Sequence, residues 1–215
     1  MSFPARIIAK IAKSDILVLP ADAESKKMNV MGTYPMLVTP QGNLYESVAI
    51  AKFLAADVAG MFGASAEDRA RVDQWIFWSF TGHLNDQKKA LAAIFGEAEV
   101  TQAEFTESMN KAKANAKTLN GALKGKDWIV GNAMTIADIV LACHFMSAQQ
   151  VLIDGGFRKA MPDFGAWFDR VVKVEAFVAV AGNVRACAKS VKPTVKAEEK
   201  KVAAPKQQAP KKEAG

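Results

Sequence analysis

The apolar positions along the chain divide it into a short mixed part and a longer helical part. Residues 6–12 repeat apolar side chains at helical spacing, and residues 16–19 form a compact aliphatic run typical of a buried strand. Residues 34–39 form a second such run, and the Gly-containing loop after it predicts a hairpin with residues 44–45. From Ser47 onwards the apolar residues again follow the helical period.

Helical spacing then continues from about Ala64 to Ser190. It predicts helices over residues 67–80, 101–123, 162–172 and 175–189, the second of them opened by a Thr-Gln-Ala-Glu capping box. The sequence therefore predicts a mixed α/β lobe over residues 1–60, followed by an all-helical lobe of about twice that size over residues 64–190.

A further helix start is marked by Thr135 and Asp138. Thr135 occupies the N-cap position and Asp138 the third helical position, while Met134 and Ile139 stand at the two positions of a hydrophobic staple. We assign Thr135 and Asp138 to helix capping, a folding role worth about 1 kcal/mol for the N-cap itself.

The net charge of +6 is unevenly distributed. Residues 191–215 hold seven lysines and three glutamates, a net +4, and the remaining 190 residues hold +2. This segment lacks large apolar side chains, so we expect it to be disordered. It is either a linker to a further domain, the interpretation we prefer, or a binding arm. Any RNA contact is expected through this tail alone, and the nearly neutral body favours protein partners.

Several classes of protein are excluded by composition. Two cysteines and two histidines allow neither a disulfide framework nor a metal site with ligand spacing, and they suit the reducing cytoplasm. Charges interrupt every long apolar stretch, so we expect neither a membrane span nor a secretory signal. Phosphate-binding loops and nucleophile elbows are absent from the sequence.

The cysteines and histidines form no evident catalytic pair. Cys143 lies on an apolar helical stripe and is expected to be a buried, inert thiol, while His144 points about 100° away from it. Cys187 stands between basic residues, which would lower its pKa if it is exposed. His83 lies in a polar segment and is expected to face solvent.

Three stretches of the chain resemble the cytosolic glutathione transferase superfamily. GTYPMLVTPQGNLYESVAIAKFLA and GNAMTIADIVLAC are similar to motifs of the superfamily as a whole. FRKAMPDFGAWFDRVVKVEAFVAVAGNVRACAK is similar in spacing to one branch, the gamma subunits of the translation elongation factor 1 complex, and a Lys-rich tail also fits that branch. The resemblance covers roughly residues 5–190. It implies a glutathione-transferase-like fold, with an abbreviated thioredoxin-like lobe followed by an all-helical lobe.

The resemblance also implies a glutathione-binding position. Tyr34 and Pro35 match the family's cis-proline, whose preceding backbone pairs with the cysteinyl part of glutathione. Glu46 and Ser47 match the acidic-hydroxyl pair that holds the γ-glutamyl end. Each has a plainer interpretation: the cis-proline as a feature of the fold, and Glu46–Ser47 as an N-cap with an adjacent acid.

The catalytic group is where the sequence departs from the family. The thiol-activating residue of the family follows the first strand, but here only four residues precede the match to the first helix. Either residues 5–11 are recruited as a strand, or the lobe is abbreviated. Ser2 is the only hydroxyl near the expected position, and its place close to the terminus argues against a catalytic role.

The resemblance therefore implies a scaffold in preference to an enzyme. We expect a module of the elongation factor 1 gamma subunit that docks the guanine-nucleotide-exchange subunit and supports aminoacyl-tRNA delivery, with the tail raising the effective concentration of partners. The alternatives are a glutathione transferase or peroxidase, and an appendage of an aminoacyl-tRNA synthetase assembly. No cofactor is expected, although glutathione is a possible ligand. Homodimerisation is common in the superfamily, but no residue here demands it.

Overall fold

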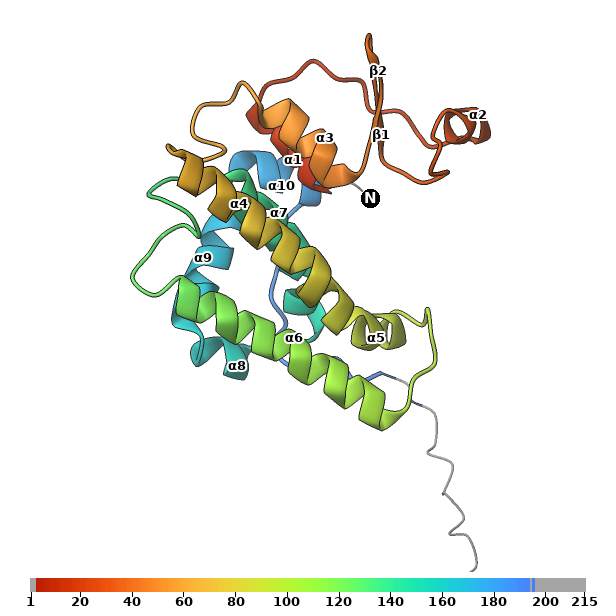
Figure 1. Cartoon of the computed structure of the whole chain (residues 1–215). Helices are drawn as coiled ribbons and strands as arrows, with labels where there is room; N and C mark the ends of the chain where they lie inside the picture. The colour runs from red at the N-terminus through yellow and green to blue at the C-terminus, as the bar shows by residue number, and fades with distance from the viewer. Residues whose placement is uncertain (1–2, 194, 196–215) are drawn as a thin grey trace, which may run out of the picture.

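The computed structural model of the chain describes residues 3–193 and 195. Most of these residues are helical, and one short antiparallel hairpin lies towards the N-terminus (Figure 1). In chain order the elements are α1 (Phe3–Ile11), α2 (Ala23–Lys27), β1 (Met36–Thr39), β2 (Gly42–Tyr45), α3 (Ser47–Ala55), α4 (Ala66–Trp78), the π-helical turn η1 (Ser79–His83), α5 (Leu84–Ile94), α6 (Gln102–Ala122), α7 (Ile136–Val151), α8 (Gly155–Lys159), α9 (Pro162–Val172) and α10 (Glu175–Ala181).

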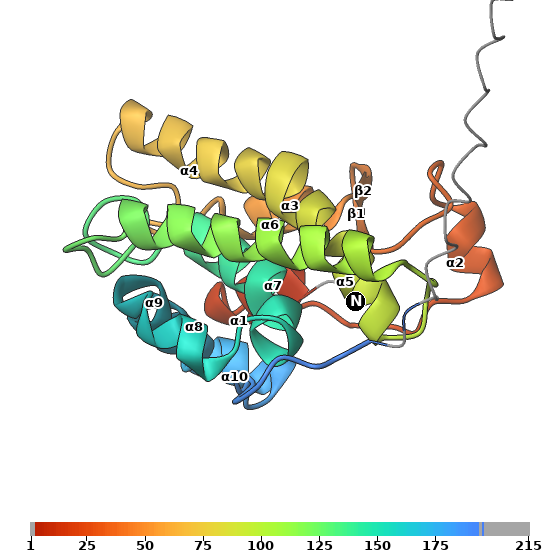
Figure 2. The same cartoon turned by 90° about the horizontal axis from the view of Figure 1, so that it is seen from below.

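Helix α7 is the central helix of the fold. Its sequence is apolar on nearly all sides and most of its side chains are buried, as expected of a helix in the middle of a protein. Helices α1, α3, α4, α5 and α9 all pack against it. Figure 2 shows α7 with α6 on one side and α10 on the other. None of the helices in the described part of the chain combines the length and the apolar character that crossing a bilayer requires.

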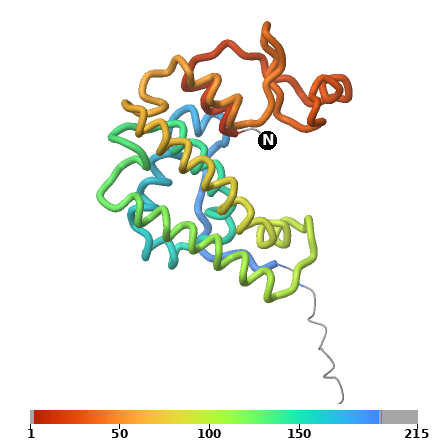
Figure 3. Tube along the Cα trace, viewed as in Figure 1, coloured from red at the N-terminus to blue at the C-terminus, as the bar shows by residue number. Residues whose placement is uncertain are grey.

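The first lobe is built on α1, which packs against α3, α7 and α10. Strands β1 and β2 pair in the register Leu37↔Leu44, and these two leucines pack against the core. Figure 3 shows this lobe at one end of the molecule. The predicted hairpin and the helix from Ser47 are confirmed. The alternative in which residues 5–11 form a strand is wrong, since they belong to α1.

The strand predicted over residues 16–19 is also wrong. These residues have no regular secondary structure, and Leu17 is 84% exposed. In the described part of the chain the sheet holds only β1 and β2. An aliphatic run becomes a buried strand only where a neighbouring strand and a covering layer exist, and here neither lies beside it.

The last predicted helix is shorter than its pattern indicated. Helix α10 ends at Ala181, and Gly182 follows it with a φ of 73°, a left-handed conformation that favours glycine. The chain then runs without helical structure along the end of α7. There, the backbone N–H of Cys187 donates to the carbonyl of Gln149 at 2.9 Å. This bond and a second one from Val191 to Val151 hold the segment against α7 in place of the helix that the pattern predicted.

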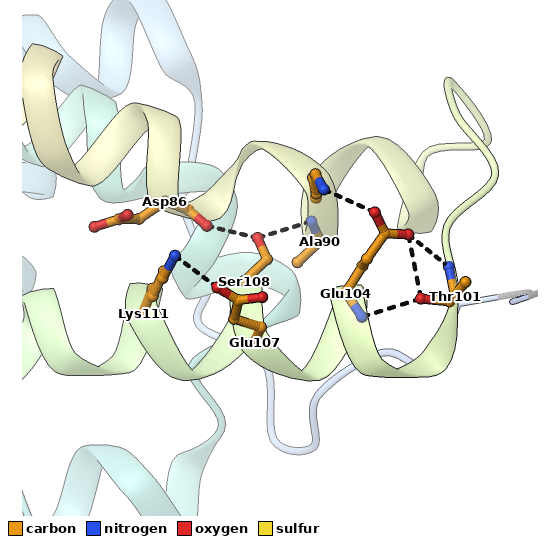
Figure 4. Close-up of polar contacts among 8 residues, drawn as sticks. Asp86, Ala90, Thr101, Glu104, Glu107, Ser108 and Lys111 are labelled. Carbon is orange, nitrogen blue, oxygen red and sulfur yellow. Dashed lines mark hydrogen bonds and ion pairs between the residues drawn. The ribbon is translucent and has the colours of Figure 1, made fainter.

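Helices α5 and α6 are joined by polar contacts that surround one buried serine (Figure 4). Ser108 Oγ donates to the carbonyl of Asp86 at 2.5 Å and accepts the N–H of Ala90 at 3.0 Å. At the start of α6, Glu104 accepts the N–H of Thr101 at 3.0 Å, and Thr101 Oγ1 accepts the N–H of Glu104 at 3.2 Å. The capping box predicted at Thr101 is confirmed.

The carboxylate of Asp138 joins three segments of the helical lobe. One oxygen accepts the backbone N–H and the hydroxyl of Thr135, at 2.8 and 3.0 Å. The other accepts the backbone N–H of Ile129 at 3.0 Å and the indole N–H of Trp167 at 2.8 Å. Burial raises the pKa of Asp138, and the four hydrogen bonds act in the opposite direction. The N-terminus of α7 is thereby fixed both to the connector before it and to α9.

One of the chain's two histidines, His144, lies on α7, and the other, His83, packs against this helix. His83 is buried, its ring stacks on Phe145 with 3.5 Å between ring centroids, and its Nε2 lies 3.3 Å from the carbonyl of His144. Gln87 donates to the same carbonyl at 3.0 Å, and Ser79 Oγ lies 2.8 Å from the Nδ1 of His144. The expectation that His83 faces solvent is wrong, because the turn η1 packs against α7 and carries the ring inside.

We expect Asp138→Ala to lower the free energy of unfolding by about 3–5 kcal/mol, because it leaves buried donors without an acceptor. Trp167→Phe keeps an aromatic ring but removes one donor, so it should cost about 1–3 kcal/mol. Urea unfolding followed by circular dichroism measures both losses.

Asp68 provides the matched control, because it closes a capping box with Ser65 at the surface end of α4. Asp68→Ala should cost about 1 kcal/mol. If Asp138→Ala cost no more than Asp68→Ala, the buried contacts of Asp138 would add nothing to a surface cap.

A second prediction concerns acid sensitivity. Burial lowers the pKa of His83 to about 3 and that of His144 to about 4, against about 6.5 in an unfolded chain. Both imidazoles are therefore neutral in the fold, and unfolding is favoured by their protonation. Stability should be at its full value above about pH 6.5 and fall towards pH 4, by about 1.4 kcal/mol per pH unit for each imidazole.

These are the only histidines in the chain, so two imidazole resonances report the effect directly by NMR. Neither should shift between pH 8 and pH 5.5. In the double variant His83→Gln, His144→Gln, the free energy of unfolding should depend less steeply on pH between 6.5 and 5. A histidine that titrates near pH 6.5 in the folded protein would contradict the prediction.

Candidate functional site

The hairpin brings together the two residue pairs that the family resemblance singles out. Met36 pairs with Tyr45, so Pro35, just before β1, lies at the same end of the hairpin as Glu46, just after β2. The peptide bond between Tyr34 and Pro35 is cis. One small region therefore holds the backbone of Tyr34 and the start of α3.

Glu46 has an unusual backbone conformation at this point. Its φ is 66°, in the left-handed region that glycine favours, and its side chain is exposed. Residues held in such conformations cost about 1–3 kcal/mol and gather at functional sites. The conformation directs the chain from β2 into α3, whose first residue is Ser47.

The N-terminus of α3 offers donors to an anion. No side chain caps this helix, and the amides of its first turn have no partner within the helix. Together with the hydroxyl of Ser47, they present a partly positive helix end to solvent. The arrangement can hold a carboxylate at Ser47 and an ammonium group at Glu46, which is the ligand chemistry that the resemblance implies.

The Tyr34 side chain has a different role. Its hydroxyl donates to the carbonyl of Asp22 at 2.7 Å and lies 2.7 Å from Ser25 Oγ. Asp22 and Ser25 form the capping box of α2. The side chain of Tyr34 therefore holds α2 in place, which leaves only its backbone for a ligand. No pattern in the sequence indicated this contact, which spans twelve residues.

The expected position of a thiol-activating group lies at the edge of the described chain. Ser2 falls outside the described residues. Burial raises the pKa of the Cys143 thiol well above its usual range, in agreement with the predicted inert role. Cys187 is only partly exposed, and burial and the charge of Asp154 raise its pKa, so the lowering expected for an exposed thiol does not occur. The imidazole of His144 is engaged by Ser79, as given above.

Neither a metal-binding cluster nor a cavity adds a candidate functional site among the described residues. Within residues 3–193 and 195, no cluster of three His, Cys, Asp or Glu side chains could hold a metal ion. A cavity of about 490 Å³ lies between α4 and the end of α6. It contains no histidine, cysteine or serine and none of the hairpin residues; its lining residues are Glu67, Ala70, Arg71, Gln74, Trp75, Ala122, Lys126 and Ile129.

The sequence placed Thr135 and Asp138 at a helix start, and the structure shows them there, in contact with each other. The sequence did not indicate that Asp138 also accepts a hydrogen bond from the indole N–H of Trp167. The spacing of 29 residues has no local signal. The sequence offers only an indirect sign of this hydrogen bond. An acidic residue stands at the start of an apolar helix, and a distant tryptophan needs an acceptor for its indole N–H.

Comparison with known proteins identifies the helical lobe. The family model for the C-terminal domain of glutathione S-transferases matches residues 85–175. Elongation factor 1-gamma 1 of Oryza sativa subsp. japonica is 32% identical over 190 residues, which are 87% of this chain and 44% of that protein. Elongation factor 1-gamma of Danio rerio is 27% identical over 165 residues, 74% of this chain and 37% of that protein. The chain thus spans less than half the length of these relatives.

Solved structures share the fold of both lobes over most of the chain. The GST-like domain of elongation factor 1-gamma from Saccharomyces cerevisiae has a TM-score of 0.80 at 19% identity, covering 90% of this chain and 94% of that one. Glutathione transferase F1 from poplar has a TM-score of 0.73 at 14% identity, covering 84% and 92%. The predicted fold class, a small α/β lobe followed by a helical lobe, is confirmed. The chain has the glutathione-transferase-like fold, and its predicted resemblance to elongation factor 1-gamma is confirmed.

Proposed function

We propose that the chain is a scaffold module of a translation elongation factor 1 gamma subunit, which docks the guanine-nucleotide-exchange subunit and supports aminoacyl-tRNA delivery. The observation that carries this proposal is the 32% identity to the rice protein over 190 residues. The likeness to the poplar transferase, at 14% identity, is one of fold alone. Sequence and fold together therefore favour the elongation factor branch.

Exposed apolar side chains on the first lobe support a protein partner. The carbonyl of Met28 accepts hydrogen bonds from the side chains of Asn43 and Tyr45, so the stretch after α2 lies beside the hairpin face that also carries Val38. Patches of large exposed apolar residues mark interaction sites in soluble proteins. We call this set the first-lobe apolar surface: Leu17, Val18, Leu19, Met28, Val30, Met31 and Val38.

The chemistry of the described residues supports a scaffold in preference to a catalyst. Both thiols have raised pKa values, and the Tyr34 hydroxyl is bonded to the cap of α2. A glutathione thiol at the hairpin would therefore meet no free phenol from Tyr34. Partner binding by surface burial needs no such group, and the first-lobe apolar surface supplies area for it.

Docking is tested with the purified exchange subunit of the elongation factor 1 complex and the full chain. We expect a stable complex by size-exclusion chromatography and isothermal titration calorimetry. The double variant Leu17→Ser, Val30→Ser should bind at least about tenfold more weakly, because it removes two apolar side chains from the contact. Both are more than four-fifths exposed, so the free protein should keep its stability.

The control double variant is Phe77→Ser, Phe95→Ser, which removes exposed apolar side chains from α4 and the end of α5. It should bind like the unaltered chain. Equal losses in both variants would reject the first-lobe apolar surface as the docking face. No complex with the exchange subunit would reject the scaffold proposal, and capture of aminoacyl-tRNA synthetases in its place would favour the appendage alternative.

A second candidate function is glutathione binding, favoured by the backbone of Glu46. Its left-handed conformation places an exposed carboxylate directly before the uncapped N-terminus of α3. A ligand with a free ammonium group and a carboxylate, such as the γ-glutamyl end of glutathione, matches this pair of groups.

Titration calorimetry with reduced glutathione tests this candidate. Glu46→Ala should weaken binding about 10- to 100-fold, the loss expected for a charge-assisted hydrogen bond. Glu67→Ala, at the exposed first turn of α4, should leave binding unchanged. No heat of binding at millimolar glutathione would remove the candidate and leave the docking proposal untouched. Conjugation of an aryl halide would show that the chain is also an enzyme.

A further inference from the structure

A set of basic residues lies on α6, α8 and the segment after α10, three parts of the chain that lie in contact. This segment is held against the end of α7 and the start of α8: the N–H of Gly155 donates to the carbonyl of Ala188 at 3.3 Å, and the N–H of Val191 donates to that of Val151 at 2.8 Å. Figure 2 shows the segment running beneath α7. We call the set the basic face: Lys113, Lys117, Arg158, Lys159, Arg185, Lys189 and Lys192.

Two members of the basic face are anchored. Arg158 donates to Gln149 at 2.7 Å and to Asp169 at 2.8 Å, and Lys113 lies 3.5 Å from Asp154. Their side chains are 16% and 20% exposed. These two cations serve the fold, since each has its carboxylate and little access to solvent.

The other five cations are exposed, and they form no ion pair with another described residue. None of the ion pairs between described residues involves Lys117, Lys159, Arg185, Lys189 or Lys192. Asp154 and Asp169 are already paired, and Asp163 stands in the first turn of α9. The face therefore has a surplus of positive charge.

This surplus is local. Residues 1–190 carry 21 basic and 19 acidic side chains, so the body is nearly neutral overall. An even distribution of these charges would leave no positive region. Their concentration here produces a local potential that attracts anions and is weakened by salt.

The basic face also lacks an apolar centre. Of the large apolar residues that are exposed in the described chain, only Val191 lies on it. The ring of Phe157 is half-buried, with the amines of Lys113 and Lys117 at 5.3 and 5.9 Å from its centroid. Protein-docking sites surround an apolar core with a polar rim, whereas phosphate contacts need only placed cations. The composition favours a nucleic-acid backbone over an acidic protein.

We propose that the basic face binds the phosphate backbone of RNA without reading its sequence. The sequence predicted RNA contact through residues beyond 190 alone; the proposal places contact on the folded body. Lys117, Lys159, Arg185 and Lys189 supply the charge, and Phe157 holds the amine of Lys117 in place. The proposal is independent of partner docking, because the first-lobe apolar surface shares no residue with the basic face.

Fluorescence anisotropy with a labelled 20-nucleotide oligouridylate tests the proposal on the full chain. The variant Lys117→Gln, Lys159→Gln, Arg185→Gln, Lys189→Gln removes four exposed charges. At 100 mM KCl it should bind at least about tenfold more weakly. The slope of log affinity against log salt should also become less steep by about 3, since each contact to a single strand contributes about 0.7.

A matched variant distinguishes the effect of the basic face from the effect of net charge. Lys10→Gln, Lys26→Gln, Arg69→Gln, Lys88→Gln removes three lysines and one arginine that are exposed and outside the ion pairs described above. It should keep the affinity within about threefold and the salt slope unchanged. Both variants should unfold at the temperature of the unaltered chain.

Two results would overturn the proposal. Equal losses in the two variants would mean that RNA responds to total charge or to the Lys-rich tail. Binding of polyglutamate but not of oligouridylate would mean that the face takes an acidic protein. Neither result bears on capture of the exchange subunit, so failure here is distinguishable from failure of the docking proposal.

Discussion

The helical lobe depends on one buried carboxylate, that of Asp138. Its four hydrogen bonds reach backward to Ile129, across the helix start to Thr135 and over 29 residues to Trp167. Because the group is fully buried, its desolvation is offset only while all these donors remain in place. The position of α7 follows from this contact, and the helices on its sides take their places from α7.

Local sequence patterns predicted local elements well. They failed where contact with a distant segment determines the secondary structure or the burial of a residue. The capping box at Thr101 and the hairpin beside Leu37 were predictable, because every partner lies within a few residues. The exposed Leu17 and the buried His83 were not: one lacks the neighbour its pattern implied, and the other is enclosed by α7. At the candidate site, the motif indicated Glu46 and Ser47. Their backbone geometry and the second role of Tyr34 required the fold.

The described chain has two surfaces of opposite character at separate places. The first-lobe apolar surface lies on the hairpin and on the segments before and after α2, and the basic face lies on α6, α8 and the segment after α10. The buried core of α7 separates them. A body with chemically distinct sides can hold two different macromolecules at once without competition between them.

The segment after α10 also determines how the body would respond to mechanical load. Three backbone hydrogen bonds hold it, at Cys187, Ala188 and Val191. A pulling force applied beyond Val195 meets the packing of Val195 against the core first, then the bond of Val191 and then the other two bonds in turn. The segment would therefore peel away one bond at a time before tension reaches Gly182 and the buried helices. Stepwise detachment of this segment would therefore take up tension before it reaches the buried core.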